Sequence, residues 1–347
     1  MTESFVSIRN LYKIFGPSPK SMISHAKSGL GKEEMLRKYG HVLGLRDINV
    51  EIQKGKITVI MGLSGSGKST LIRHFNRLID PTDGQVVVNK VDITKLGPSE
   101  LRQLRRTQMS MVFQKFALFP HETVLNNIGT PCSVRGDDPK AVKLTALKWL
   151  GRVGLAGTEN MYPHQLSGGM QQRVGLARAL ASNSEIMLMD EAYSALDPII
   201  RSSMQDLLLE LQKDLHKTVV FITHDLDEAL KIADHLVILK DGEVVQQGDP
   251  QAIMLNPSNE YVKRFVSEIN RLRVIRVRSV MDVAAAAASN DVIDGNVTLE
   301  RAIGAAMGDA NKVFDVQLDG KHAGSLRMEN VLKVISTVDD IDAQHVS

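Results

Sequence analysis

The sequence lacks the features of a secreted or membrane-spanning protein. Its 347 residues contain a single cysteine, Cys132, which excludes an internal disulfide and favours a reducing compartment. No run approaches the ~18 apolar residues of a membrane span, and residues 1–10 lack the apolar core of a signal peptide. We therefore expect a cytosolic protein, so any role at a membrane must come through a partner.

The chain also lacks a large excess of positive or negative charge, and aromatic side chains are scarce. The 42 lysines and arginines are balanced by 40 aspartates and glutamates, and a net charge of +2 argues against a nucleic-acid-binding protein, which normally carries a strongly basic domain. Aromatic residues make up 4% of the chain, so aliphatic side chains must build most of the core. The length allows one large domain and one small domain.

Apolar runs of strand length recur through the first 250 residues. From residue 61 onward they alternate with helix-like segments, which predicts a parallel α/β sheet. A polar and basic insertion at residues 17–41 contains a helix-like segment at 32–39, and residues 117–165 have helical periodicity and are expected to form a lobe of their own. The predicted strands are residues 5–8, 48–52, 57–60, 85–88, 109–113, 186–189, 218–222 and 236–239.

The first motif with a chemical meaning is a phosphate-binding loop. It follows the apolar strand at 57–60 and precedes a helical run at 71–78, which is the context that the pattern G-x-x-x-x-G-K-[ST] requires. Glycines let backbone N–H groups cradle phosphate oxygens, and the next helix directs its positive N-terminus at them. In this motif the lysine reaches the β- and γ-phosphates of ATP and the serine hydroxyl holds Mg²⁺. The loop reads Gly62-Leu63-Ser64-Gly65-Ser66-Gly67-Lys68-Ser69-Thr70.

A second motif is the apolar strand at 186–189, which ends in Asp190 and Glu191. Both carboxylates should lie at the carboxyl edge of the sheet, where ligands of such folds bind. We expect Asp190 to hold the Mg²⁺ shell and Glu191 to act as general base on the attacking water.

A third motif, Leu166-Ser167-Gly168-Gly169-Met170, lies just before a predicted helix at 174–181. A serine and two glycines at a helix start form a second anion-binding nest. One phosphate loop and one extra nest in the same chain suggest that each nest serves the nucleotide of another subunit. The alternative is an ordinary N-capped helix.

Together these motifs and His224 resemble the nucleotide-binding subunit of ATP-binding cassette transporters, over about residues 5–250. The resemblance implies an α/β fold, with a phosphate-loop ATPase core, an antiparallel β subdomain and a helical subdomain at about 115–175, all within residues 1–256. It implies a homodimer in which two ATP molecules lie between the loop of one subunit and Ser167–Met170 of the other. That dimer would drive an integral-membrane permease from the cytoplasmic face of the inner membrane, with an extracytoplasmic substrate-binding protein acting indirectly.

The resemblance also implies roles for single residues. Phe15 resembles the aromatic that stacks on adenine, with Tyr12 as its rival. Gln114 resembles the glutamine that touches Mg²⁺ and the water and relays to the membrane subunit. Asp197 belongs to a loop that crosses the dimer interface, and His224 resembles the histidine that contacts the γ-phosphate. Residues 118–120, with Phe119, are where we expect the permease to dock.

The finer resemblance is to importers of quaternary amines such as glycine betaine, choline and proline betaine. This resemblance rests on three features: the insertion at 17–41, the continuation of the loop to Asn76-Arg77-Leu78, and Met170 in place of the commoner glutamine. The ATPase subunit of a histidine or proline importer would show much the same sequence features. More distant alternatives are a cassette ATPase outside transport, a phosphate-loop kinase and a regulatory ATP sensor.

The C-terminal part has a different composition. Residues 257–274 are expected to form a basic linker, which is either a solvated face or a sensor of ionic strength on anionic lipid. Residues 275–347 resemble a single, degenerate cystathionine-β-synthase (CBS)-like regulatory module with a helix–strand–turn–strand–helix pattern from residue 297, a small α+β module. A dimerisation tail without sensing is the alternative.

Overall fold

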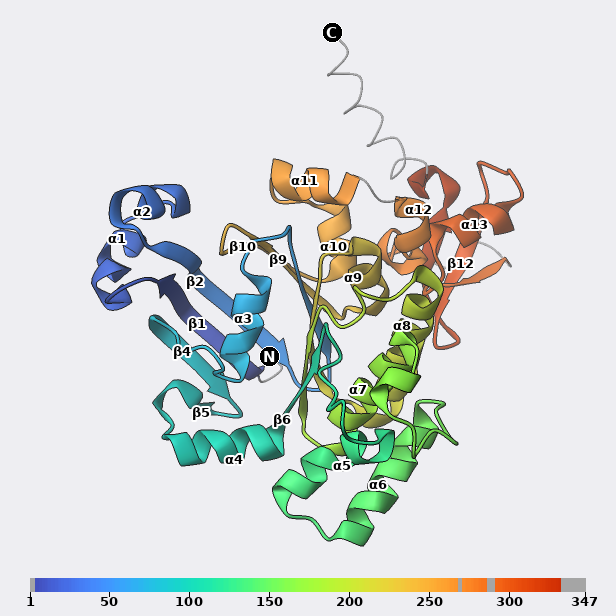
Figure 1. Ribbon diagram of the computed structural model, residues 1–347. Coiled ribbons are helices and arrows are strands. Elements are labelled where there is room, and N and C mark those ends of the chain that lie inside the picture. Colours follow the sequence, from blue (N-terminus) through green and yellow to red (C-terminus); the bar gives the residue numbers. More distant parts are fainter. Residues whose placement is uncertain (1–3, 268–269, 286–290, 332–347) are drawn as a thin grey trace. The chain divides into compact units, whose positions relative to one another are not determined.

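The computed structural model describes residues 4–267, 270–285 and 291–331, which belong to two compact units (Figure 1). The first unit ends at Gln247 and the second begins at Gly248. This division falls before residue 256, the predicted end of the first domain. Helix α10 (Pro250–Leu255) therefore belongs to the second unit.

A six-stranded sheet forms the centre of the first unit. All residues of β3 (Ile57–Met61), β7 (Ile186–Asp190) and β8 (Thr218–Thr223) are buried, as expected for strands covered on both faces. The neighbouring pairs from β9 to β6 run parallel, so the carboxyl ends of these strands meet at one edge. From one side to the other the strands are β10 (Glu243–Gly248), β9 (His235–Lys240), β3 (Ile57–Met61), β8 (Thr218–Thr223), β7 (Ile186–Asp190) and β6 (Met109–Phe113).

A second, four-stranded sheet contains the predicted antiparallel subdomain. Strand β4 (Asp83–Val88) pairs antiparallel with β1 (Ser4–Phe15) in this sheet, so the prediction that residues 85–88 belong to the parallel sheet is wrong. The burial of β4 alternates, as in a sheet with one covered face. The order is β2 (Val42–Gln53), β1 (Ser4–Phe15), β4 (Asp83–Val88) and β5 (Val91–Asp92).

The main core joins the two sheets through helix α3 (Lys68–Phe75). Ile8 and Ile52 of the antiparallel sheet, Ile60 of β3 and Phe75 of α3 belong to one apolar cluster. Since α3 follows the phosphate loop directly, this packing fixes where the loop lies.

The insertion folds into three short helices beside the antiparallel sheet, on the left of Figure 1. Met35 of α2 is fully buried and packs with Tyr12, Ile14 and Leu43. The His41 ring closes the insertion, since its nitrogens lie 2.7 Å from both Pro17 O and Tyr39 O. The helices are η1 (Pro19–Met22), α1 (Ile23–Lys27) and α2 (Lys32–Tyr39), the last with the predicted bounds.

The predicted helical lobe is present, with α5 and α6 side by side at the bottom of Figure 1. Side chains cap the starts of its helices: Thr123 accepts from Asn126 N, Asp138 from Lys140 N, and Ser167 from Met170 N. These helices are α5 (Val124–Arg135), α6 (Pro139–Arg152) and α7 (Gly168–Ala181). The remaining helices of the first unit are η2 (Ile93–Lys95), α4 (Pro98–Gln108), η3 (Pro163–Gln165), α8 (Pro198–Leu215) and α9 (Leu226–Ile232).

The second unit contains a three-stranded sheet. Strand β11 runs parallel to β12, and β12 and β13 form an antiparallel hairpin that turns at residues 319–320. Residues 257–274, expected as a linker, instead hold two helices, and α11 buries Val262 and Val266. Within the described ranges of both units, no helix has the length and apolar character of a membrane span. Besides α10, the elements are α11 (Glu260–Ser267), α12 (Arg271–Val274), η4 (Val277–Ser279), β11 (Val292–Asp294), α13 (Leu299–Ala306), β12 (Val313–Leu318) and β13 (Lys321–Arg327).

Candidate functional site

The phosphate loop lies between the end of β3 and the start of α3. Gly62, Gly65 and Gly67 have φ angles of +152°, +77° and +103°, which disfavour any residue with a Cβ. At Gly62 a Cβ would also lie 2.2 Å from Leu239 O of the neighbouring strand β9. The tight course of the loop therefore depends on these glycines and on its contact with the sheet.

The Lys68 side chain folds back over its own loop. Its Nζ donates to Gly62 O at 2.9 Å and to Leu63 O at 3.1 Å, and the residue is 5% exposed. Burial lowers the pKa of the Lys68 ammonium, although the nearby carboxylates of Glu191 and Asp190 oppose that shift. A buried cation held inside a glycine-rich loop is suited to an anionic phosphate.

A hydroxyl and a carboxylate meet where α3 faces the end of β7. Ser69 Oγ donates to Asp190 Oδ1 at 3.0 Å, and Arg73 Nη2 lies 3.7 Å from Asp190 Oδ2. Hydroxyl and carboxylate oxygens are the ligands that Mg²⁺ prefers in proteins. This pair, predicted from two motifs 121 residues apart, therefore fits the ion.

Glu191 lies at the centre of a polar cluster beyond the sheet edge. Its Oε1 is 3.9 Å from Lys68 Nζ, and its Oε2 accepts from Gln114 Nε2 at 3.3 Å and lies 4.0 Å from His224 Nδ1. Gln114 also donates to Ser194 Oγ at 3.1 Å. Glu191 has a φ of +47°, a left-handed conformation that a residue with a Cβ adopts at a cost in free energy. The strands β6, β7 and β8 thus bring three predicted site residues together.

A cleft of about 630 Å³, the loop cleft, opens beside the phosphate loop. This volume suits a small-molecule ligand. Phe15 lines the cleft and is 40% exposed, whereas Tyr12 is 7% exposed and packs in the core of the insertion. Of the two aromatic candidates, only Phe15 can therefore meet a ligand in the loop cleft. The lining residues are Phe15, Lys32, Val42, Gly44, Leu63, Ser64, Gly65, Gly67, Lys68, Ser69, Thr70, Glu191 and His224.

The structure does not bring the third motif to the loop cleft. Ser167 lies at the start of α7, where its hydroxyl accepts from Met170 N at 3.3 Å, and the residues from Ser167 to Met170 do not line the cleft. Asp197 similarly caps α8, accepting from Ile199 N at 3.1 Å and from Ile200 N at 3.0 Å. A single chain therefore assembles the part of the predicted site around the phosphate loop, and the nest from Ser167 to Met170 is not part of it.

The motifs missed three residues of the loop cleft, Lys32, Val42 and Gly44, of which Lys32 is charged. It comes from the insertion, and its Nζ donates to Gly65 O at 3.1 Å. The basic character of the insertion was the only signal in the sequence. Its position beside the loop depends on how α2 packs on β2.

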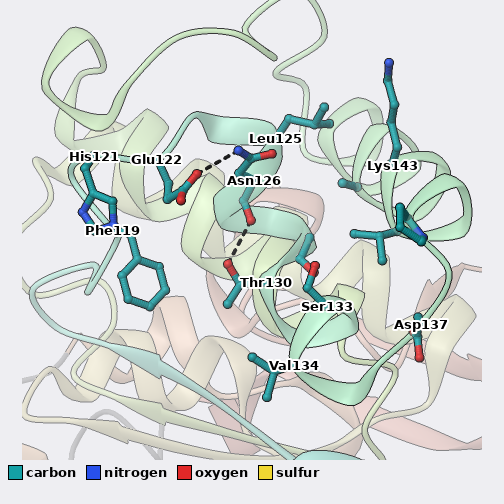
Figure 2. Close-up of a pocket in the computed structure, with 14 residues that line it drawn as sticks. Phe119, His121, Glu122, Leu125, Asn126, Thr130, Ser133, Val134, Asp137 and Lys143 are labelled. Atoms are coloured by element: carbon teal, nitrogen blue, oxygen red, sulfur yellow. Dashed lines mark hydrogen bonds between the residues drawn. The ribbon is translucent and has the colours of Figure 1, made fainter.

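A second cleft of about 700 Å³, the helical cleft, lies along α5 and α6 (Figure 2). Phe119, which is 43% exposed, lines it together with His121, Leu125 and Val134. The buried Asn127 fixes the Phe119 backbone, since its Oδ1 accepts from Phe119 N at 2.8 Å and its Nδ2 donates to Phe119 O at 3.1 Å.

Comparison with known proteins adds four findings. Residues 45–194 match the protein family described as ABC transporter. The chain is 50% identical over 276 residues to the glycine betaine transport ATP-binding protein OpuAA of Bacillus subtilis, an alignment that covers 80% of this chain and 66%, just under two thirds, of OpuAA. It is 41% identical over 335 residues to the trimethylamine N-oxide transport system ATP-binding protein TmoW of Ruegeria pomeroyi, covering 96% of this chain and 98% of TmoW. A dimeric structure of the ATP-binding cassette MJ0796 in a post-hydrolysis state, bound to ADP and Pi, is 32% identical with a TM-score of 0.60, and covers 71% of this chain and 98% of that one.

Proposed function

Because this chain belongs to the ATP-binding subunits of the ABC transporter family, we propose that it hydrolyses ATP to drive uptake of small compounds that carry a methylated, positively charged nitrogen. The proposed class of transported compound rests on the agreement between two relatives, one named for glycine betaine and one for trimethylamine N-oxide. Both compounds join a trimethylated, positively charged nitrogen to an anionic oxygen. Choline and proline betaine share the quaternary nitrogen and belong to the same proposal.

The chemistry follows from the geometry of the loop cleft. The Lys68 ammonium neutralises phosphate oxygens of ATP, and Phe15, which also lines the cleft, supports adenine. Ser69 and Asp190 would hold Mg²⁺, with Gln114 as the further ligand that the family pattern implies, and the ion would supply positive charge to the phosphates. Glu191 orients and deprotonates the attacking water, while His224 contacts the γ-phosphate from the end of β8.

The complete site needs two copies of the chain. The nest from Ser167 to Met170 lies outside the loop cleft, and the related cassette MJ0796 has been solved as a dimer. In our proposal the nest of each subunit contacts the ATP in the loop cleft of its partner, and Asp197 lies at the dimer interface. ATP binding then closes the dimer and hydrolysis opens it.

The helical cleft is the proposed contact with an integral-membrane permease. An exposed aromatic, Phe119, next to apolar and polar side chains is suited to receive a short segment of a partner (Figure 2). Through that contact the chain would act peripherally at the cytoplasmic face of the inner membrane. An extracytoplasmic binding protein would deliver the cargo to the permease.

Residues 275–347, which form part of the second unit, are proposed to be a single CBS-like module. The predicted order of helix, strand, turn and strand is present in α13, β12 and β13, and β11 completes the sheet. Of its expected final helix, residues 328–335, the structure describes residues 328–331, which are helical, and residues 332–335 lie outside the described residues.

Uptake in a strain deleted for this chain tests the proposal. We expect loss of uptake of labelled glycine betaine, choline or trimethylamine N-oxide, restored by the wild-type chain and not by the Lys68→Ala variant. Loss of histidine uptake alone, with uptake of all three amines intact, would assign the chain to an amino-acid importer instead. Failure of the chain to co-purify with a permease would contradict transport altogether.

A further inference from the structure

The insertion brings a second lysine to the phosphate loop. Lys32 lines the loop cleft, and its Nζ donates to Gly65 O at 3.1 Å. Apart from Gly65 and its two chain neighbours, no heavy atom of the described residues lies within 4 Å of the place where a Cβ at Gly65 would stand, so the loop is open on that side. The Lys32 ammonium is therefore next to the loop, at a position that a ligand in the cleft can reach.

The backbone that carries Lys32 is firmly held. Arg46 of β2 donates through Nη2 to Leu30 O at 2.5 Å and to Ala26 O at 3.2 Å, and through Nη1 to Glu243 Oε1 at 2.8 Å. On the other side of Lys32, Met35 is fully buried in the cluster that also contains Leu43. Lys32 thus lies between two anchored points, and its position beside the loop is built into the fold.

The positive charge of Lys32 does not stabilise helix α2. Lys32 is the first residue of α2, where the helix dipole disfavours a cation, and the acidic Glu33 and Glu34 follow it. Across the ranges that the structure describes, no carboxylate forms an ion pair with Lys32, whereas Lys38 of the same helix pairs with Glu34. The Lys32 ammonium is accordingly available to an anion in the loop cleft.

Lys32 and Lys68 have the same relation to the loop. Each donates to loop carbonyls, Lys68 to Gly62 O and Leu63 O, and Lys32 to Gly65 O. A lysine has a flexible four-carbon stem, so its ammonium can move a short distance from a carbonyl to a phosphate oxygen. A polyanionic phosphate tail beside the loop would attract both.

From this geometry we infer that Lys32 is a nucleotide-binding residue, which the insertion supplies to the phosphate tail of ATP. The inference rests on the proposed function, because it takes ATP as the occupant of the loop cleft. Lys32 adds positive charge beside Gly65, in addition to that of Lys68 beside Gly62 and Leu63, and it contacts phosphate rather than adenine. The insertion thereby becomes part of the nucleotide site.

The test compares Lys32→Met with the matched control Lys38→Met, which removes an exposed lysine from the same helix. Binding of ATP, ADP and AMP to the full chain is measured by calorimetry at low and high salt, and kcat and KM are measured for ATP. We expect Lys32→Met to weaken ATP binding about five-fold and to raise KM with little change in kcat, in line with a partly exposed charge contact. AMP binding should be unchanged, the ATP effect should shrink at high salt, and Lys32→Arg should restore binding.

Equal ATP affinity of wild type and Lys32→Met would overturn the inference while leaving the proposed function intact. An equal loss in Lys38→Met, or the same loss for AMP as for ATP, would also overturn it, because the effect would then come from the helix or from the shape of the cleft. If the wild-type chain binds no ATP, the proposed function and the inference fail together.

Discussion

Ser167 offers a way to separate helix capping from nucleotide binding. Its hydroxyl accepts from Met170 N at 3.3 Å at the start of α7, and Thr123 makes the same kind of cap at the start of α5, accepting from Asn126 N at 3.2 Å. Replacing a serine or threonine cap by alanine costs about 1 kcal/mol of stability. We therefore expect Ser167→Ala and Thr123→Ala to lower the free energy of unfolding of the first unit by similar amounts.

ATPase activity should distinguish the two variants. If the Ser167 hydroxyl also donates to a phosphate of ATP in the partner's loop cleft, its removal costs a charge-assisted hydrogen bond of roughly 2 kcal/mol, about a 30-fold loss of affinity. Thr123 lies in the same helical lobe but contacts no predicted nucleotide position, so Thr123→Ala should keep its activity.

The assay is urea unfolding of both variants together with steady-state ATPase activity against ATP concentration. Ser167→Ala should show a raised KM and low turnover, and Thr123→Ala neither. If both variants lose stability equally and both keep full ATPase activity, Ser167 is only a helix cap and the two-subunit site is wrong.

Three further predictions follow from other parts of the chain. Glu191→Gln should still bind ATP, lose turnover by about 100-fold or more and accumulate as a dimer in gel filtration, because the base is gone while the side-chain shape is kept; normal turnover would contradict the assignment. Phe119→Asp should uncouple transport in reconstituted vesicles while sparing ATP binding, whereas Leu144→Asp, on the exposed part of α6 outside the helical cleft, should leave both transport and ATP binding intact; equal loss of transport in the two variants would remove the docking role. Burial lowers the pKa of His74 from its ordinary value of 6.5 to about 4. Between pH 6.5 and pH 4, His74 is therefore protonated in the unfolded chain and neutral in the folded chain, which favours unfolding as the pH falls. Stability should fall by about 2 kcal/mol from pH 7 to pH 5, and His74→Leu should flatten that dependence in chemical denaturation; an unchanged slope would contradict it.

The sequence predicted the strands and the site residues that depend on local patterns. The apolar runs at β3, β7 and β8 and the acidic end of β7 follow from burial on both faces, which leaves a clear signal in the residues themselves. The fold is confirmed by comparison with solved ATP-binding cassettes.

Features that depend on tertiary packing could not be predicted from the sequence. The choice between Phe15 and Tyr12 was open because both lie near the end of β1, and only the packing of the insertion buries Tyr12. Strand β4 joined the wrong sheet in the sequence analysis because its short apolar run fits either a parallel or an antiparallel neighbour. Lys32 looked like one charge among many until α2 placed it beside Gly65.

The central claim is that each ATP site is built by two copies of the chain, and mixing two inactive variants tests it most directly. Lys68→Ala destroys the loop half of the site and Ser167→Ala the nest half, so each variant alone should have little ATPase activity. In an equal mixture, half of the dimers combine both variants and retain one intact site, which predicts recovery of about one quarter of wild-type activity if the sites act independently. A mixture no more active than the two variants measured separately would contradict the two-subunit site.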